Sequence, residues 1–335
     1  MKMAKKNGIF FRAVPDNGMA HAMVGADNKI SLGFPNCFIP TPRIEQLLRE
    51  ATETMWFPVK KGAHIKLPQQ TWLVNFYADA DEYAKAMEFL RHIAKMTGAP
   101  VFNHPDGILN SRRDKVSEVL QGVPGLVAPK CIRFSPKLPE DFQQAFDENQ
   151  MVYPVLVRPT ASQSGTHLVK IDGPSDWVKV HTIPWGGATI HMTQFVDFAN
   201  DAGEYIKLRA VCAGDQVFIR HTLISDDWLV HAMDRTEAIV DREFEMHQRL
   251  RENPVFIKLV KDAKTKIGLD YFGLDLGWRS DDEFVLFEAN AAMSILSTAH
   301  MPTYRRPEYM KILKDIEEGV VRAIRAVQFR GNGGA

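Results

Sequence analysis

The pattern of apolar and polar residues predicts an α/β arrangement in the first third of the chain. The apolar run 72–77 is typical of a short buried strand, and a helix is expected after it. Asp79 or Asp81 can cap this helix, Gly98 ends it, and residues 100–103 are again extended. A strand, a helix and a second strand in this order make a βαβ unit. The apolar stripe of the helix consists of Tyr83, Met87, Leu90 and Ala94.

The remaining pattern predicts a small mixed region and then a region rich in strands. Helices are expected at 112–120, 140–148, 255–267 and 309–327, and strands at 131–134, 152–158, 167–171, 190–196, 204–213, 216–225 and 228–232. A chain of 335 residues is also long for one core. We therefore expect an N-terminal α/β domain (1–105), a small central α+β subdomain (106–192) and a larger antiparallel C-terminal subdomain (193–330).

The most informative segment is a predicted β-hairpin near the C-terminus, formed by residues 268–276 and 284–290. With its turn centred on Asp281 and Asp282, Asp275 lies opposite Glu288, and Asn290 shares the face of Glu288 because side chains alternate along a strand. The apolar flanking residues favour burial, and buried acids must be paired or bind cations. Hard oxygen ligands suit Mg²⁺. The alternative is an acidic edge hairpin that faces solvent, but outward faces seldom carry so many large apolar residues.

Basic residues near this hairpin are suited to a polyphosphate. Lys207 and Arg209 alternate with apolar neighbours and share one strand face, and Arg220 on the next strand can reach the same face. Arg158 ends an apolar strand before the polar loop 160–166, whose backbone N–H groups can approach phosphate oxygens closely. An ordinary surface hairpin explains Arg158 equally well. For His231 a place in the cluster and a structural role both remain open.

Composition excludes several classes of protein. Lys plus Arg equals Asp plus Glu, at 41 each, so no overall charge favours nucleic acid or a membrane surface. Three distant cysteines without metal-ligand spacing indicate free thiols in a reducing cytoplasm. The loop 160–166 matches neither a Walker A nor a dinucleotide-binding motif.

Taken in order, these segments resemble the ATP-grasp enzymes. The strand 153–159 with the Ser164-Gly165 loop is similar to the family's strand and phosphate-covering loop, and the hairpin resembles its metal-ligand signature. A closer likeness is to the ATP-grasp region that follows tetratricopeptide repeats in some bacterial proteins, where an Asp-Ala-Asp stretch also precedes a helix and a Phe-Asn-His-Pro-like turn. The segment that looks like the adenine-contacting linker consists of Thr193, Gln194, Phe195, Val196 and Asp197.

The chain departs from the family at three places. Arg113 and Arg158 stand where the family usually places lysines that touch the nucleotide phosphates. Arginine keeps the charge and can fork onto phosphate. Gly273 stands where many of its ligases carry an arginine, whose role passes to Arg209 or Arg220. Two acids, Asp197 and Glu204, are candidates for the ribose contact.

The resemblance implies an ATP-dependent ligase that transfers the γ-phosphoryl group to a carboxylate and lets an amine, or less often a thiol, attack the acyl-phosphate. Asp275, Glu288 and Asn290 would hold Mg²⁺, in two ions, and Mn²⁺ is an alternative. The substrates would be a small-molecule or peptide carboxylate and an amine, with no nucleic acid and no membrane involved. A cytoplasmic enzyme is expected, and a homodimer is compatible with it. A small-molecule kinase and a nucleotide-binding module without turnover are the rival interpretations.

The acceptor pocket is expected beside the N-terminal domain. Four polar residues there sit at the ends of predicted strands, where such pockets form. Capping and turn roles explain two of them, Asp79 and Asn103, equally well. The four residues are Asn75, Asp79, Asn103 and His104.

Overall fold

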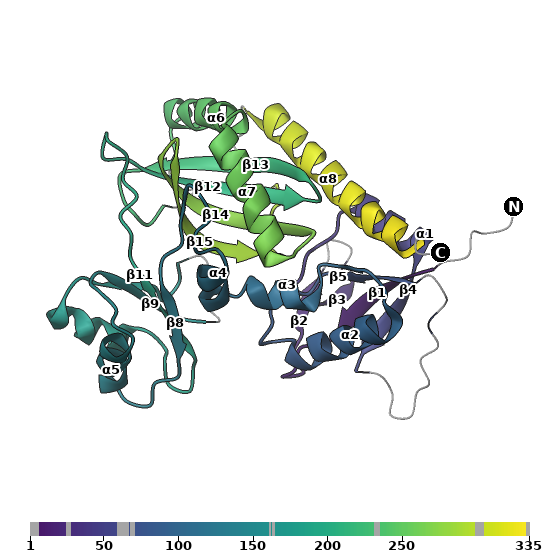
Figure 1. Ribbon diagram of the computed structural model, residues 1–335, viewed down its shortest axis with the longest axis horizontal. Helices are drawn as coiled ribbons and strands as arrows, with labels where there is room; N and C mark the ends of the chain where they lie inside the picture. Colours follow the sequence, from purple (N-terminus) through teal and green to yellow (C-terminus); the bar gives the residue numbers. More distant parts are fainter. Residues whose placement is uncertain are drawn as a thin grey trace, which may run out of the picture.

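A computed structural model describes residues 7–24, 28–58, 67, 71–160, 162, 165–230, 235–298 and 305–332. The described residues form three larger sheets, a separate two-stranded hairpin and the helices that join and cover them (Figure 1). None of the described helices combines the length and the apolar content that crossing a membrane requires.

The N-terminal sheet is parallel and has the order β4-β1-β5-β6. The predicted βαβ unit is confirmed, because α2 joins β5 to β6 and ends at Gly98, whose φ is +66°. Asp79 does not cap α2 itself; its carboxylate accepts the N–H groups of Asp81 and Glu82 in the preceding turn. The elements are β1 (Gly8–Ala13), β2 (His21–Val24), β3 (Ile30–Gly33), α1 (Pro42–Ala51), β4 (Thr52–Phe57), β5 (Trp72–Asn75), α2 (Ala84–Thr97) and β6 (Val101–Phe102).

The second sheet is antiparallel, with the order β10-β9-β11-β8. Its own core packs Phe142 and Phe146 of α5 against the strands. The strand β7 is not part of this sheet and pairs in parallel with β15 (Glu283–Asn290) of the third sheet. The elements are α3 (Pro105–Asn110), α4 (Arg113–Val119), β7 (Leu126–Val127), β8 (Cys131–Phe134), α5 (Glu140–Glu148), β9 (Val155–Pro159), β10 (Val169–Ile171), the 3₁₀ helix η1 (Pro174–Thr182) and β11 (Ile190–Gln194).

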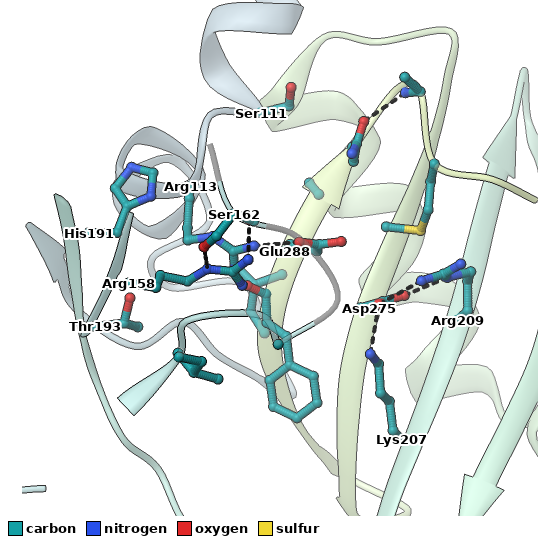
Figure 2. A pocket seen from close by; sticks show the side chains of 18 of the residues that line it. Ser111, Arg113, Arg158, Ser162, His191, Thr193, Lys207, Arg209, Asp275 and Glu288 are labelled. Carbon is teal, nitrogen blue, oxygen red and sulfur yellow. Dashed lines mark hydrogen bonds and ion pairs between the residues drawn. The ribbon is translucent and has the colours of Figure 1, made fainter. Parts of the chain in front are cut away.

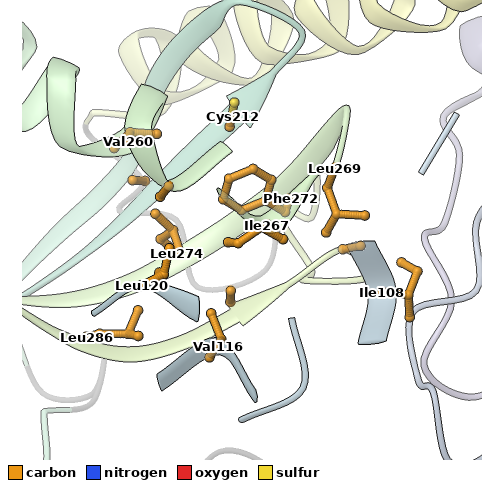
Figure 3. Close-up of a cluster of buried hydrophobic side chains, with 14 of the residues drawn as sticks. Ile108, Val116, Leu120, Cys212, Val260, Ile267, Leu269, Phe272, Leu274 and Leu286 are labelled. Atoms are coloured by element: carbon orange, nitrogen blue, oxygen red, sulfur yellow. The ribbon is translucent and has the colours of Figure 1, made fainter. Parts of the chain in front are cut away.

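The third sheet has the order β13-β12-β14-β15-β7 and carries α7 on one face. Figure 3 shows this core, where Val116 and Leu120 belong to the same cluster as Val260 and Ile267 of α7 and Leu274 of β14. On the other face, α8 packs against Val211. The elements are β12 (Tyr205–Ala213), β13 (Gln216–Ser225), α6 (Glu237–Arg251), α7 (Pro254–Ile267), β14 (Tyr271–Ser280), β15 (Glu283–Asn290) and α8 (Arg306–Asn332).

The prediction of a strand at 228–232 is wrong for residues 228–230, the part of this range that the structure describes. Trp228 to Val230 are not in a strand, because the side chains of Ser225 and Asp227 accept backbone N–H groups two residues ahead and bend the chain. The sequence pattern also gave no indication of α6. Two of its four buried positions are polar, Glu243 and His247, and this hides the helical apolar stripe.

Candidate active site

Four strands of the third sheet bring four polar side chains into one row. β14 and β15 turn at Asp281 and Asp282, and Asp275 lies opposite Glu288 as predicted, because the two register shifts between the turn and this pair cancel. Arg209 on β12 lies opposite Asp275, and His221 on β13 lies opposite Arg209. Directly opposed residues share a sheet face. The row is therefore His221, Arg209, Asp275 and Glu288, on the face that α7 leaves free.

Asp275 is the buried centre of this row, at 2% exposed. Its two oxygens accept hydrogen bonds from Arg209 Nε at 2.7 Å and Nη2 at 2.8 Å, and Lys207 Nζ lies 3.0 Å from Oδ2. Burial alone raises the pKa of this carboxyl, but the charges of Lys207 and Arg209 outweigh burial and hold the pKa well below its ordinary value. Asp275 is thus ionised and paired with two cations.

Glu288 is more accessible, with its side chain 30% exposed, and forms an ion pair with Arg113 at the start of α4. Arg113 also donates a hydrogen bond to the carbonyl of Phe287 at 2.6 Å, which connects the start of α4 to β15. Within the described residues, Glu288 Oε1 has no hydrogen-bond partner. Asn290 Oδ1 accepts the N–H of Ala292 at 2.7 Å and keeps a second lone pair.

The donor set fits Mg²⁺ bound together with phosphates. No group of three or more His, Cys, Asp or Glu side chains able to hold a metal occurs among the described residues. The site offers two opposed carboxylates, Asp275 and Glu288, and the amide oxygen of Asn290. Mg²⁺ commonly takes one or two carboxylates and completes its shell with waters and substrate phosphates. A site with few protein ligands is therefore consistent with this ion.

A cavity of about 1340 Å³ lies over the row and is lined by residues of the second and third sheets and of the loops 36–37 and 78–82 beside the N-terminal sheet. Figure 2 shows Asp275 between Arg209 and Lys207, with Glu288 and Arg158 nearby. The residues expected from the sequence that line it are Asp79, Arg113, Arg158, Gly165, Thr193, Gln194, Phe195, Val196, Lys207, Arg209, Arg220, Asp275, Glu288 and Asn290.

Two described residues that were expected at the nucleotide, Asp197 and Glu204, do not line the cavity, and neither do Asn75, Asn103 and His104, which were expected at the acceptor pocket. Asp197 is exposed and accepts the N–H of Ala199, and Glu204 pairs with Arg242 at 2.8 Å. The ribose contact assigned to one of these acids stays a prediction. Ser164 and His231 lie outside the described residues, so their expected roles also stay predictions.

A β-bulge turns Arg220 and His221 toward the same cavity. The register between β12 and β13 shifts at Arg209 and Ala210, so Arg220 has no partner in the ladder. Arg220 is 6% exposed and donates to the carbonyls of Ile295 (2.7 Å) and Ser297 (2.8 Å). Burial lowers the pKa of Arg220 to about 10. Regular alternation would place only one of two neighbours on this face, and for that reason the sequence did not indicate His221.

Comparison with known proteins identifies the fold. No family model and no curated protein matches the sequence. Among solved structures, the ATP-grasp ligase PsnB with minimal precursor, Mg and ADP shares 13% identity over 96% of this chain and 99% of that chain, with a TM-score of 0.45. D-alanyl-alanine synthetase A from Vibrio cholerae O1 shares 11% identity over 97% and 99%, with a TM-score of 0.50.

This chain has the ATP-grasp fold. The VanG D-Ala:D-Ser ligase from Enterococcus faecalis is a further similar structure, at 13% identity over 96% of this chain and 99% of that chain, with a TM-score of 0.48. Identities this low establish the architecture alone.

At one position of the hairpin, a side chain would require neighbouring side chains to move. A Cβ at Gly273 would lie 2.5 Å from Met293 Sδ and 3.2 Å from Ile295 Cδ1. The segment after the hairpin therefore fills the space over Gly273. An arginine at this position would require Met293 and Ile295 to move. The cations that face the cavity here come from β12 and β13 instead.

Proposed function

We propose that this protein is an ATP-dependent ligase that joins a carboxylate to an amine, or less often a thiol, through an acyl-phosphate, and releases ADP and phosphate. The observation that carries the proposal is the row Arg209, Asp275 and Glu288 across neighbouring strands at the base of the cavity. Two acids able to hold a metal lie there between cations able to hold phosphates. The resemblance to the region that follows tetratricopeptide repeats stays a prediction.

The nucleotide phosphates would lie between the second and third sheets. Arg158 and Arg113 face this space from β9 and α4, and Lys207 faces it from β12. Asp275, Glu288 and Asn290 would hold Mg²⁺, in two ions, with Mn²⁺ able to take the same ligands. Bound there, the metal would neutralise charge on the β- and γ-phosphates. The side chains then need only position and stabilise charge, since phosphoryl transfer requires little covalent chemistry from the protein.

The carboxylate and its acyl-phosphate would lie beside Arg209 and Arg220. Arg220 is buried, and within the described residues no carboxylate pairs with it; its donors point to backbone carbonyls. A buried cation without an acid is costly unless an anion arrives. Arg220 is therefore suited to the incoming carboxylate, and Arg209 to the oxygens of the transferred phosphoryl group.

The second substrate would enter from the side of the N-terminal sheet, where Asp79 and Glu82 line the cavity. The cavity exceeds the roughly 300–1,000 Å³ usual for a single small ligand, so a nucleotide and a small-molecule or peptide carboxylate can fit together. The identity of the amine, a cytoplasmic location and assembly as a homodimer all remain predictions.

The test is to incubate the protein with Mg·ATP, hydroxylamine and pooled carboxylates (the amino acids, their N-acetyl derivatives, and short peptides). Nucleotides are then separated by chromatography, and hydroxamates are detected with ferric ion. We expect ADP together with a hydroxamate, because hydroxylamine traps an acyl-phosphate. AMP as the main product would reject this mechanism. ADP with a stable phosphorylated product and no hydroxamate would indicate a kinase, and nucleotide binding without any turnover would indicate a binding module.

A further inference from the structure

A buried histidine on the cavity wall has no hydrogen-bond partner. His191 on β11 is 4% exposed and lines the cavity. Within the described part of the chain, neither of its ring nitrogens forms a hydrogen bond. The nearest acid is Asp114, whose Oδ1 lies 3.8 Å from Nε2, too far for a hydrogen bond. Leaving a buried donor unsatisfied costs about 1–3 kcal/mol, so such a group calls for a ligand.

His191 belongs to a row of basic side chains. It lies opposite Arg158 on β9 and opposite Arg133 on β8, so the three residues share one face of the second sheet. Arg133 is paired with Asp81 at 2.8 Å. Arg158 contacts the hydroxyl and carbonyl of Ser162, and among the described residues no carboxylate pairs with it. Among the described residues, Arg158 therefore has no carboxylate partner, and the only acid beside His191 is Asp114, beyond hydrogen-bond distance.

Asp114 behind the ring is itself fixed. Arg112 donates to both of its oxygens, at 2.7 and 2.9 Å, and Arg112 also contacts Asp81. Asp114 is 7% exposed, and burial raises the pKa of its carboxyl. His191 and Arg112 outweigh burial, so the pKa lies below its ordinary value. A fixed carboxylate 3.8 Å from Nε2 favours the protonated ring through its charge.

We propose that His191 donates a hydrogen bond to a phosphate oxygen of the bound nucleotide, next to Arg158, with the charge of Asp114 stabilising the protonated imidazole. This inference rests on the proposed function, because it takes the cavity to be a nucleotide site. Figure 2 shows His191 on the same side of the cavity as Arg113 and Arg158, away from Asp275. The phosphate would thus be held from the second sheet by a histidine as well as by arginine.

Phosphate binding would also change the charge of His191. Burial lowers the pKa of its imidazole, and so do Arg113 on α4 and Arg133 on β8, whereas Asp114 raises it. Arg158 on β9 faces the ring as a further cation. The ring is therefore neutral in the free protein at neutral pH. An arriving phosphate raises the pKa and favours proton uptake, so nucleotide affinity gains a contribution as the pH falls.

The experiment compares Mg·ADP with adenosine by titration calorimetry. His191→Leu should weaken Mg·ADP binding about tenfold or more, the loss expected for one hydrogen bond to a charged group, and leave adenosine affinity unchanged. The matched control is His247→Leu, because His247 is also buried, at 3% exposed, but lies on α6 outside the cavity lining. This control should leave both affinities at the wild-type value.

A pH series separates phosphate binding from a packing role. Between pH 8 and 6 the wild type should gain Mg·ADP affinity relative to His191→Leu, since only the wild type takes up a proton at this position. An unchanged affinity for Mg·ADP in the variant, or parallel pH dependences, would overturn the inference. Equal losses for adenosine and Mg·ADP would do the same, because they would indicate a packing defect.

Two further results decide the inference if the variant does not fold or if the protein binds no nucleotide. If His191→Leu does not fold, histidine side-chain NMR of the wild type decides, with the signal assigned by its absence in His191→Gln. The inference requires the ring nitrogen chemical shifts of His191 to change when Mg·ADP is added and to stay the same with adenosine. Chemical shifts that do not change with Mg·ADP reject the inference. A wild type that binds neither adenosine nor Mg·ADP refutes the proposed function itself. Nucleotide binding by the wild type with no role for His191 refutes the inference alone.

Discussion

Arg209 and Asp275 lie opposite each other on β12 and β14 and form two hydrogen bonds, of 2.7 and 2.8 Å, between the guanidinium and the carboxylate. Removing one partner of a buried ion pair leaves an uncompensated charge. Asp275→Asn should therefore lower the free energy of unfolding by about 3–5 kcal/mol in urea denaturation and abolish ATP turnover. Arg209→Met combined with Asp275→Leu should recover part of the stability without turnover. Wild-type stability in Asp275→Asn would contradict this account.

The same pair predicts how stability depends on pH. The pKa of Asp275 is lower in the folded protein than its ordinary value of about 3.9, so the carboxylate stabilises the fold above that pH. This contribution is lost as the pH falls through the folded pKa. The melting temperature of the wild type should therefore drop more between pH 5 and pH 2 than that of Asp275→Asn, by calorimetry. Parallel curves for the two proteins would refute the assignment.

Glu288 should separate catalysis from stability. Its side chain is 30% exposed and pairs with Arg113, so Glu288→Gln should shift the free energy of unfolding by only about 1 kcal/mol or less, as for exposed ion pairs. Loss of a metal ligand should still lower the ADP formation rate by about 10²-fold or more. Glu283→Gln, on the same strand and paired with Arg279, is the matched control and should keep the wild-type rate. Equal rates in both variants would remove Glu288 from the metal site.

The sequence predicted the pairing at the centre of the site. Asp275 and Glu288 could be placed opposite each other by counting from the turn at Asp281 and Asp282, because the two register shifts in between add one residue to each strand and cancel. His221 was missed, since a bulge breaks the alternation on β13. His191 was missed for another reason: its significance depends on Asp114 and Arg158, which are distant in sequence and meet only when the second sheet and α4 pack together.

The same distinction holds for the fold. The helix α2 and the strand β6 follow directly from periodicity and from Gly98. By contrast, Glu243 on α6 can be buried because Arg235 and the N–H of Ile224 satisfy its carboxylate. No local sequence pattern predicts these partners. Periodicity therefore does not predict buried polar residues whose partners are distant in sequence.

Gly273 should be sensitive to a single added carbon. A Cβ there would lie 2.5 Å from Met293 Sδ, so Gly273→Ala should cost about 1–3 kcal/mol of stability and displace the segment that lines the cavity. Met293→Ala removes the nearest clash. In a double-mutant cycle by urea denaturation, the pair should be less destabilised than the sum of the single variants. Additive losses would indicate that Met293 does not fill the space over Gly273.

Asn103 should be a structural joint rather than an acceptor-pocket residue, because it is absent from the cavity lining. Its side chain accepts the N–H groups of Asp270 (3.0 Å) and Tyr271 (2.9 Å) and donates to the carbonyl of Tyr271 (2.9 Å), which ties the end of β6 to the start of β14. Its φ of +56° lies in the left-handed region.

Asn103→Ala should therefore lower the free energy of unfolding by about 3 kcal/mol, at about 1 kcal/mol for each hydrogen bond. Asn103→Gly loses the same bonds but accepts the positive φ, so it should be more stable than Asn103→Ala by about 1 kcal/mol. Urea denaturation measures both differences, and calorimetry should show wild-type Mg·ADP affinity in each folded variant. A stable Asn103→Ala with weakened nucleotide binding would instead place Asn103 in the site.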